Sequence, residues 1–178
     1  QQGGIQQGSD QQGTPIFVKK VINHVDYLLE YYQNPNDWNQ DLIAQGRNYL
    51  NRSAIGQNVS QYHLEASIAE QHTYPDGELP GKWKNILSLY NRLLQLHYSP
   101  IVALNRTYAF AKVYGNQKAI DEARKIDLDH YHFYHALLGE LYSLTNVEES
   151  KTHWLLAKEK TKNIREKNYY QLKVDELI

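Results

Sequence analysis

The stretch that decides the fold is "WKNILSLYNRLLQLHYSPIVALNRTYAFAKVYG", residues 83–115. Its apolar residues recur every three or four positions in both halves, which is the period of one helical face. Between the halves, Ser99 and Pro100 supply an N-cap and a proline at the first helical position, where a missing backbone N–H costs nothing. Gly115 suits the left-handed backbone that often closes a helix. The stretch therefore predicts two consecutive helices, over residues 83–97 and 100–114.

The same helical period extends in both directions from this stretch. It predicts further helices over residues 15–32, 37–50, 61–72, 117–126, 129–144, 147–157 and 164–177. No segment of the sequence alternates as a strand does, and the connections are short. We therefore predict an all-α fold of antiparallel helical hairpins. Residues 1–14, "QQGGIQQGSDQQGT", are too polar to bury a core, so we expect a tail or linker there and a single all-helical domain over residues 15–178.

Composition narrows the classes of function. Nineteen Lys and Arg against twenty Asp and Glu give a formal net charge of -1, so the chain as a whole has no positive field to hold a nucleic acid backbone. The lack of cysteine excludes disulfides and cysteine nucleophiles and fits the cytoplasm. No apolar run approaches the roughly 20 residues that span a bilayer, so we expect no membrane contact. Because the chain begins with Gln and contains no Met, we expect it to be a fragment of a longer protein.

The predicted helices also contain a repeat. Residues 100–126 align on residues 131–157 at an offset of 31, which is close to the tetratricopeptide period of about 34. The alignment pairs Phe110 with Leu141, Ala119 with Ser150 and Ala123 with Trp154. The second copy has large and small side chains at the spacings that such a hairpin needs: Tyr134, Leu137, Leu138, Leu141, Ser150, Trp154 and Ala157. We therefore predict a tetratricopeptide-like, right-handed helical array.

One segment of this repeat resembles a known family. "SPIVALNRTYAFAKVYG", residues 99–115, is similar to the "SPVVALNRA" segment in the C-terminal extension of a group of extracytoplasmic-function type sigma factors. Other segments look like successive segments of that extension in the same order: "DWNQDLIAQGRNYLNRSA", "QYHLEASIAEQH", "WKNILSLYNRLL" and "LDHYHFYHALLGELY". The resemblance covers roughly residues 37 to 178 and rests on several ordered segments.

The resemblance implies a bacterial, cytoplasmic regulatory module that is fused to a sigma factor. The chain lacks the polymerase-binding and promoter-binding domains that carry out sigma function, and its sequence contains no helix-turn-helix with a basic recognition helix. Its expected partners are therefore proteins, namely its own sigma domains, RNA polymerase or a regulator. DNA is expected to be contacted only through the missing sigma domains.

The most histidine-rich stretch is "DHYHFYHA", residues 129–136. On a helix, His132 and His135 lie about 60 degrees apart and could share a ligand, whereas His130 is displaced by about 200 degrees from His132. A two-histidine metal site would need another ligand, and Asp129 is expected to cap the helix instead. We favour a packing role, because Tyr131, His132 and His135 match the "YHxxHA" pattern of the resembling family; a role in partner binding remains the alternative.

Asn105 and Arg106 are the other polar residues of interest, because they interrupt an otherwise apolar helix. A guanidinium there can clamp a carboxylate or cap the carbonyls of a neighbouring helix, which is the structural interpretation. The alternative is recognition of an acidic or C-terminal group of a partner in a helical groove. Together with Tyr131, His132 and His135, these two residues form the predicted polar cluster.

The sequence shows no nucleophile beside a base, no paired carboxylates in an apolar setting and no glycine-rich phosphate loop. We therefore expect no catalysis and no cofactor. The favoured function is a regulatory, protein-binding C-terminal domain of a sigma factor. Two alternatives stay open: a free-standing tetratricopeptide-like adaptor, and a helical enzyme that binds a metal or a small molecule.

Overall fold

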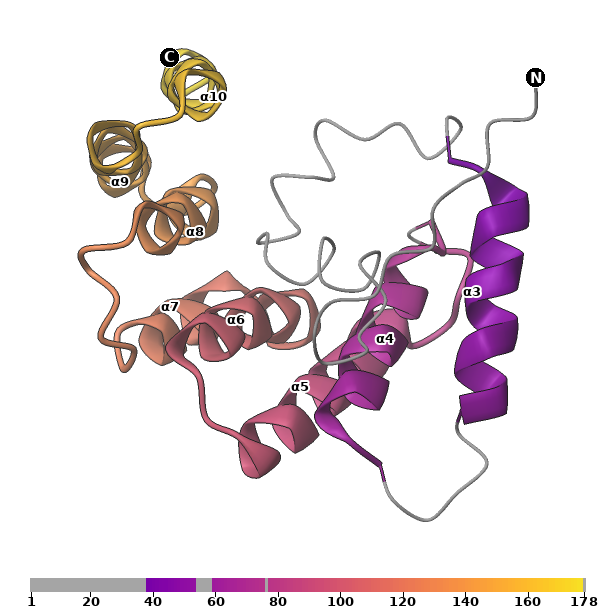
Figure 1. The fold of residues 1–178 in the computed structure, drawn as a ribbon. Coiled ribbons are helices and arrows are strands. Elements are labelled where there is room, and N and C mark those ends of the chain that lie inside the picture. Colours follow the sequence, from indigo (N-terminus) through magenta and orange to yellow (C-terminus); the bar gives the residue numbers. More distant parts are fainter. Residues whose placement is uncertain (1–37, 54–58, 76, 178) are drawn as a thin grey trace, which may run out of the picture. The chain divides into compact units, whose positions relative to one another are not determined.

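A computed structural model describes residues 38–53, 59–75 and 77–177. Within these ranges the chain forms α-helices and no strand, which confirms the predicted all-α class (Figure 1). The helices are α3 (Gln40–Ser53), α4 (Gln61–His72), α5 (Lys82–Leu96), α6 (Pro100–Tyr114), α7 (Asn116–Ala123), α8 (His132–Tyr142), α9 (Val147–Lys160) and α10 (Ile164–Asp175). The predicted tail over residues 1–14 and the predicted helix over 15–32 lie outside the described residues. None of the described helices is long and apolar enough to cross a membrane.

The contacts divide the described residues into two compact units, one that ends at His97 and one that begins at Tyr98. In the first unit α3 packs on α4, and α4 packs on α5. The buried apolar residues of α4 and α5 follow the helical stripes that the sequence predicts: Leu64, Ile68, Ile86, Leu87, Tyr90 and Leu93. Asn39 begins α3, because its side-chain Oδ1 accepts a hydrogen bond from the Leu42 N–H at 3.1 Å. The single domain expected over residues 15–178 stays a prediction.

In the second unit each helix packs on the next along the chain, from α6 through to α10 (Figure 1). This packing of successive helices is consistent with the predicted antiparallel hairpins. The seven positions that carry the tetratricopeptide-like spacing, from Tyr134 to Ala157, are all buried, and Leu137, Ser150 and Ala157 are completely so. The tetratricopeptide-like arrangement of the hairpins stays a prediction.

Helices α8 and α9 approach each other closely at one glycine. A Cβ atom built on Gly139 would lie 2.8 Å from two atoms of the Trp154 indole, so only glycine fits there without a shift. The Ser150 hydroxyl donates a hydrogen bond of 2.7 Å to the Gly139 carbonyl oxygen. Small residues on both helices therefore admit the indole into the core of this hairpin.

Both predicted ends of the helix over residues 129–144 were wrong. Helix α8 begins at His132 and not at Asp129, so Asp129 and His130 precede the helix and the predicted Asp129 cap is not formed. The helix ends at Tyr142, and Leu144, the last residue of the predicted helix over residues 129–144, is 88% exposed. The chain turns there, with the Thr145 N–H donating to the Tyr142 carbonyl three residues earlier at 2.9 Å, and Asn146 then caps α9.

Tyr114 is the last residue of the predicted helix over residues 100–114. It lies at the end of the apolar stripe of that helix, but it is exposed. Its ring packs beside Phe110 of the same helix, with 4.6 Å between ring centroids. The following residue, Gly115, has a φ of 90° and ends α6, as the sequence predicts.

Candidate functional site: two histidine networks around α8

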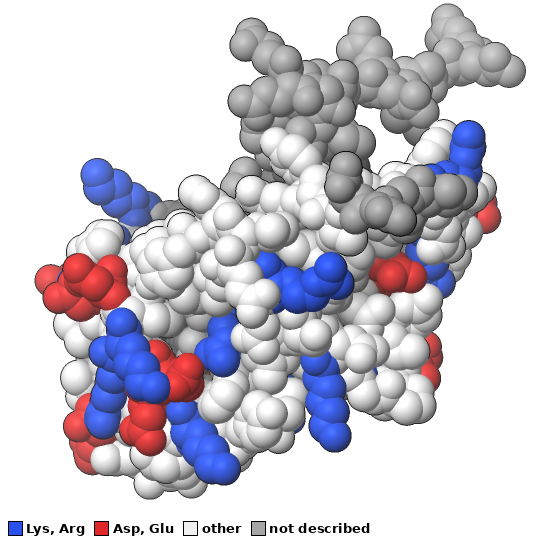
Figure 2. All heavy atoms as spheres, turned by 90° about the horizontal axis from the view of Figure 1, so that it is seen from below, with Lys and Arg blue, Asp and Glu red and all other residues white. Residues whose placement is uncertain are grey.

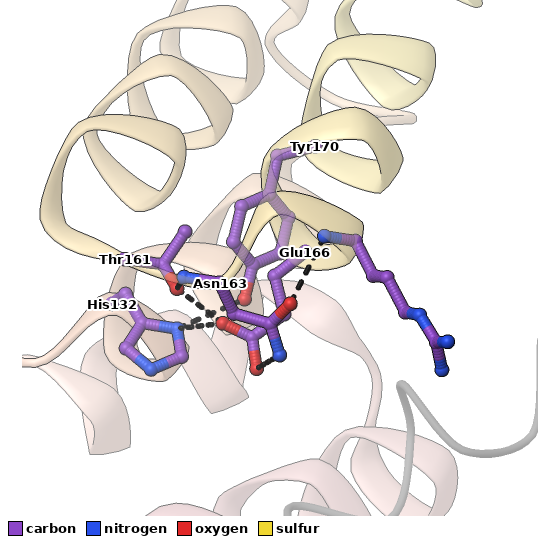
Figure 3. A network of polar contacts seen from close by, with 6 residues as sticks. His132, Thr161, Asn163, Glu166 and Tyr170 are labelled. Carbon is purple, nitrogen blue, oxygen red and sulfur yellow. Dashed lines mark hydrogen bonds and ion pairs between the residues drawn. The ribbon is translucent and has the colours of Figure 1, made fainter.

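The first polar network joins the start of α8 to the start of α10 (Figure 3). His132 Nδ1 lies 3.1 Å from the Tyr170 hydroxyl and 3.6 Å from Glu166 Oε2. The Thr161 hydroxyl donates to the same Glu166 carboxylate, whose other oxygen accepts from the Asn163 side-chain amide at 3.4 Å. Glu166 is thereby turned toward α8, and its carboxylate holds the α9–α10 turn against that helix.

The second network joins α8 to α9 through two stacked imidazole rings. His135 Nε2 lies 2.7 Å from the Asp129 carbonyl oxygen, and because a carbonyl only accepts, Nε2 must carry the proton. In the neutral ring His135 Nδ1 is then an acceptor, so the contact of 3.1 Å to His153 Nδ1 requires His153 to donate. His153 Nε2 faces Glu149 Oε2 at 4.0 Å. The geometry therefore assigns a single tautomer to His135.

The far side of the His153 ring extends this network to α7. His153 stacks on Tyr142, with 5.7 Å between centroids and 2° between the planes. The Tyr142 hydroxyl accepts a hydrogen bond of 2.6 Å from Arg124, which directly follows α7. The stack thus connects three consecutive helices of the second unit.

Burial controls the charge of these histidines. Desolvation lowers the pKa of His132, and the charge of Glu166 opposes that shift. Desolvation also lowers the pKa of His135, against the hydrogen bond to the Asp129 backbone. For His153, desolvation is again the largest cause of a lowered pKa, and the neighbouring His135 adds to it. All three rings are therefore biased toward the neutral form.

These shifts predict that acid destabilises the second unit. A histidine with a lowered folded-state pKa binds more protons when unfolded, so its stabilisation is complete above its ordinary pKa of about 6.5 and is lost as the pH falls below it. The free energy of unfolding should fall between about pH 7.5 and about pH 5, as measured by urea titration with far-UV circular dichroism.

The matched variants are His153→Gln and His130→Gln. The glutamine amide can still donate to His135 but does not titrate, so the loss of stability in acid should shrink in His153→Gln. His130 is exposed and lies outside both networks, so His130→Gln should keep the full loss. An equal loss in both variants would contradict the role assigned to His153.

The structure places the predicted polar residues in separate contacts. His132 contacts Tyr170 of α10, and His135 contacts His153 of α9. Tyr131 directly precedes α8, and its ring lies against the rings of His132 and Phe133 at 5.2 Å. Among residues 38–53, 59–75 and 77–177, no three or more His, Asp or Glu side chains are placed to hold a metal ion.

Arg106 and Asn105 have different surroundings on α6. Arg106 Nη1 lies 2.9 Å from Glu122 Oε2 of α7, and its guanidinium lies 5.1 Å from the Phe110 ring centroid. A hydrogen bond from Lys125, together with Arg106, lowers the pKa of Glu122. The carbonyl oxygen of the Asn105 side chain is buried without a hydrogen-bond partner among the described residues. Arg106 therefore clamps a carboxylate of the next helix, as the structural interpretation predicts.

Sequence reasoning missed several members of the networks. Glu166 and Tyr170 lie in the predicted C-terminal helix, and His153 directly precedes the buried Trp154. In the sequence, these residues are marked only by their position next to the apolar residues of an amphipathic helix. That position does not show which residue of another helix they contact.

The charged side chains do not form one broad basic surface on the face shown in Figure 2. Lys and Arg lie there among Asp, Glu and a larger area of uncharged residues. This mixture agrees with the formal net charge of -1.

Comparison with curated proteins finds an uncharacterized protein of Rhizobium meliloti (strain 1021) that is 27% identical over 143 residues. The match covers 79% of this chain and 34% of the relative, so the chain spans about a third of the length of the protein it matches. No family model matches the chain. No solved structure matches it either.

Proposed function

We propose that the chain is a non-catalytic regulatory module of a bacterial extracytoplasmic-function type sigma factor. In this proposal it modulates transcription initiation in the cytoplasm through contacts with its own sigma domains, RNA polymerase or another regulator. Its tetratricopeptide-like hairpins serve as a scaffold for protein binding, and it needs no cofactor.

The observation that carries this proposal is the agreement between the family-like segments and the helices. The segment "QYHLEASIAEQH" coincides with α4, and "SPIVALNRTYAFAKVYG" with α6 and its two caps. The segments that begin "DWNQ" and "LDHY" contain α3 and α8, and the segment that begins "WKNI" lies within α5. These segments follow one another in the order of the family's extension, and each corresponds to one helix. This correspondence supports a similar succession of helices in that extension and in this protein.

The two histidine networks also support a scaffold. His132 and His135 are part of the family-like "YHxxHA" pattern, and their ring nitrogens bond to α10, to α9 and to the Asp129 backbone. Side chains that join helices in this way stabilise the shape of a binding surface. The length of the relative is compatible with additional domains, because about two thirds of it lies outside the matched region.

The proposal is tested by the complete gene and by binding. The reading frame that encodes this chain should also encode a polymerase-binding and a promoter-binding sigma domain. The purified full-length protein should then bind core RNA polymerase in a pull-down with purified components. A reading frame without sigma domains, together with no binding to the polymerase, would favour the free-standing adaptor instead.

A further inference from the structure

Helix α9 has one face that the described helices leave exposed. Glu148, Lys151, Leu155 and Glu159 follow one another at intervals of three and four residues, and all four are exposed. Leu155, in the middle of this face, is 43% exposed. We call these four residues the α9 face.

The α9 face is complementary to itself when its direction is reversed. Lys151 and Glu159 each lie four residues from Leu155, on either side of it. The order is therefore base, leucine, acid. In an antiparallel pair of α9 helices centred on Leu155, Lys151 of each copy meets Glu159 of the other, and leucine meets leucine.

Within the described part of the chain, these charges have no partner. None of Glu148, Lys151 and Glu159 forms an ion pair or a side-chain hydrogen bond with any described residue. The helix dipole explains an acid in the first turn, such as Glu148, but it disfavours an acid in the last turn, where Glu159 lies. The helix itself therefore does not stabilise the charge of Glu159.

We propose that a second copy of this chain docks on the α9 face in an antiparallel, two-fold contact. Leu155 lies on the two-fold axis, and Lys151 pairs with Glu159 of the partner subunit. Such a contact is closed, because both copies use the same surface. One helix pair is a small interface, so the dimer is weak and dissociates as salt rises. This proposal stands whether or not the chain belongs to a sigma factor.

Charge reversal tests the pairing. In a dimer of Lys151→Glu, each new glutamate faces Glu159 of the partner subunit. In a dimer of Glu159→Lys, each new lysine faces Lys151 of the partner subunit. Each variant should therefore dimerise about tenfold more weakly than the unchanged chain, as measured by sedimentation equilibrium. An equimolar mixture of the two variants should dimerise again, because every pair is then opposite in charge. Dimers of either variant as strong as the original, or no recovery in the mixture, would overturn the proposal.

The absence of cysteine from the chain permits a second test of the register. Leu155→Cys should form a disulfide-linked dimer on mild oxidation, because the two side chains meet on the axis. Thr152→Cys, which is exposed one turn away, should not, because it faces a different residue of the partner. A monomeric unchanged chain at every concentration, or equal cross-linking of both variants, would also overturn the proposal.

Discussion

Replacing Trp154 with alanine is expected to lower the free energy of unfolding by about 3–5 kcal/mol. The Trp154 side chain is only 1% exposed, and it is among the largest fully buried side chains of the described residues. Its ring packs against Tyr170 at 5.7 Å and against Tyr169 at 6.1 Å, so it joins α9 to α10 as well as to α8. Removing it opens a cavity that three helices line.

Urea unfolding followed by far-UV circular dichroism measures this loss, and Leu172→Ala is the matched control. Leu172 is exposed on α10, so its truncation should cost less than about 1 kcal/mol. If Trp154→Ala were no more destabilising than Leu172→Ala, the core described for the second unit would be wrong.

The second large effect is expected at Gly139. An alanine at this position would place a Cβ atom 2.8 Å from the Trp154 ring, and this buried indole cannot move aside freely. Overpacking of this kind costs about 1–3 kcal/mol, which exceeds the gain of about 0.5–1 kcal/mol that alanine brings to a helix. Gly139→Ala should therefore destabilise the protein.

The same substitution at Gly46 should have the opposite effect on the free energy of unfolding. Gly46 lies inside α3, and a Cβ atom built on it meets no atom within 4 Å. Gly46→Ala should therefore stabilise the protein by up to about 1 kcal/mol. Urea titration of both variants provides the comparison, and stabilisation by Gly139→Ala would contradict the close approach of α8 and α9.

The sequence predicts most of the described helices because their apolar stripes are long. The predicted helix over residues 61–72 and the start at Pro100 match α4 and α6. The prediction fails at the two ends of α8. At its C-terminal end the apolar period continues through Leu144, but backbone hydrogen bonds that span three residues, such as Thr145 N–H to the Tyr142 carbonyl, turn the chain earlier. Periodicity does not detect such competition between a helix and a turn.

The sequence predicts some residues of the candidate site but not their partners on other helices. Arg106, His132 and His135 stand out in the sequence because each is polar within an apolar segment. Their partners Glu122, Glu166 and His153 belong to other helices, and the pairing depends on how those helices pack. A single sequence contains no signal for such contacts. The tautomer of His135 likewise depends on a backbone carbonyl that only the fold brings within reach.

The measurement that tests the proposed function most directly is promoter-dependent transcription with purified RNA polymerase. The full-length protein is compared with a version that lacks residues 38–178. The regulatory proposal predicts that this deletion changes the yield of transcript or its response to a regulator, while the sigma domains still bind the polymerase. Unchanged initiation and an unchanged response after the deletion would contradict it.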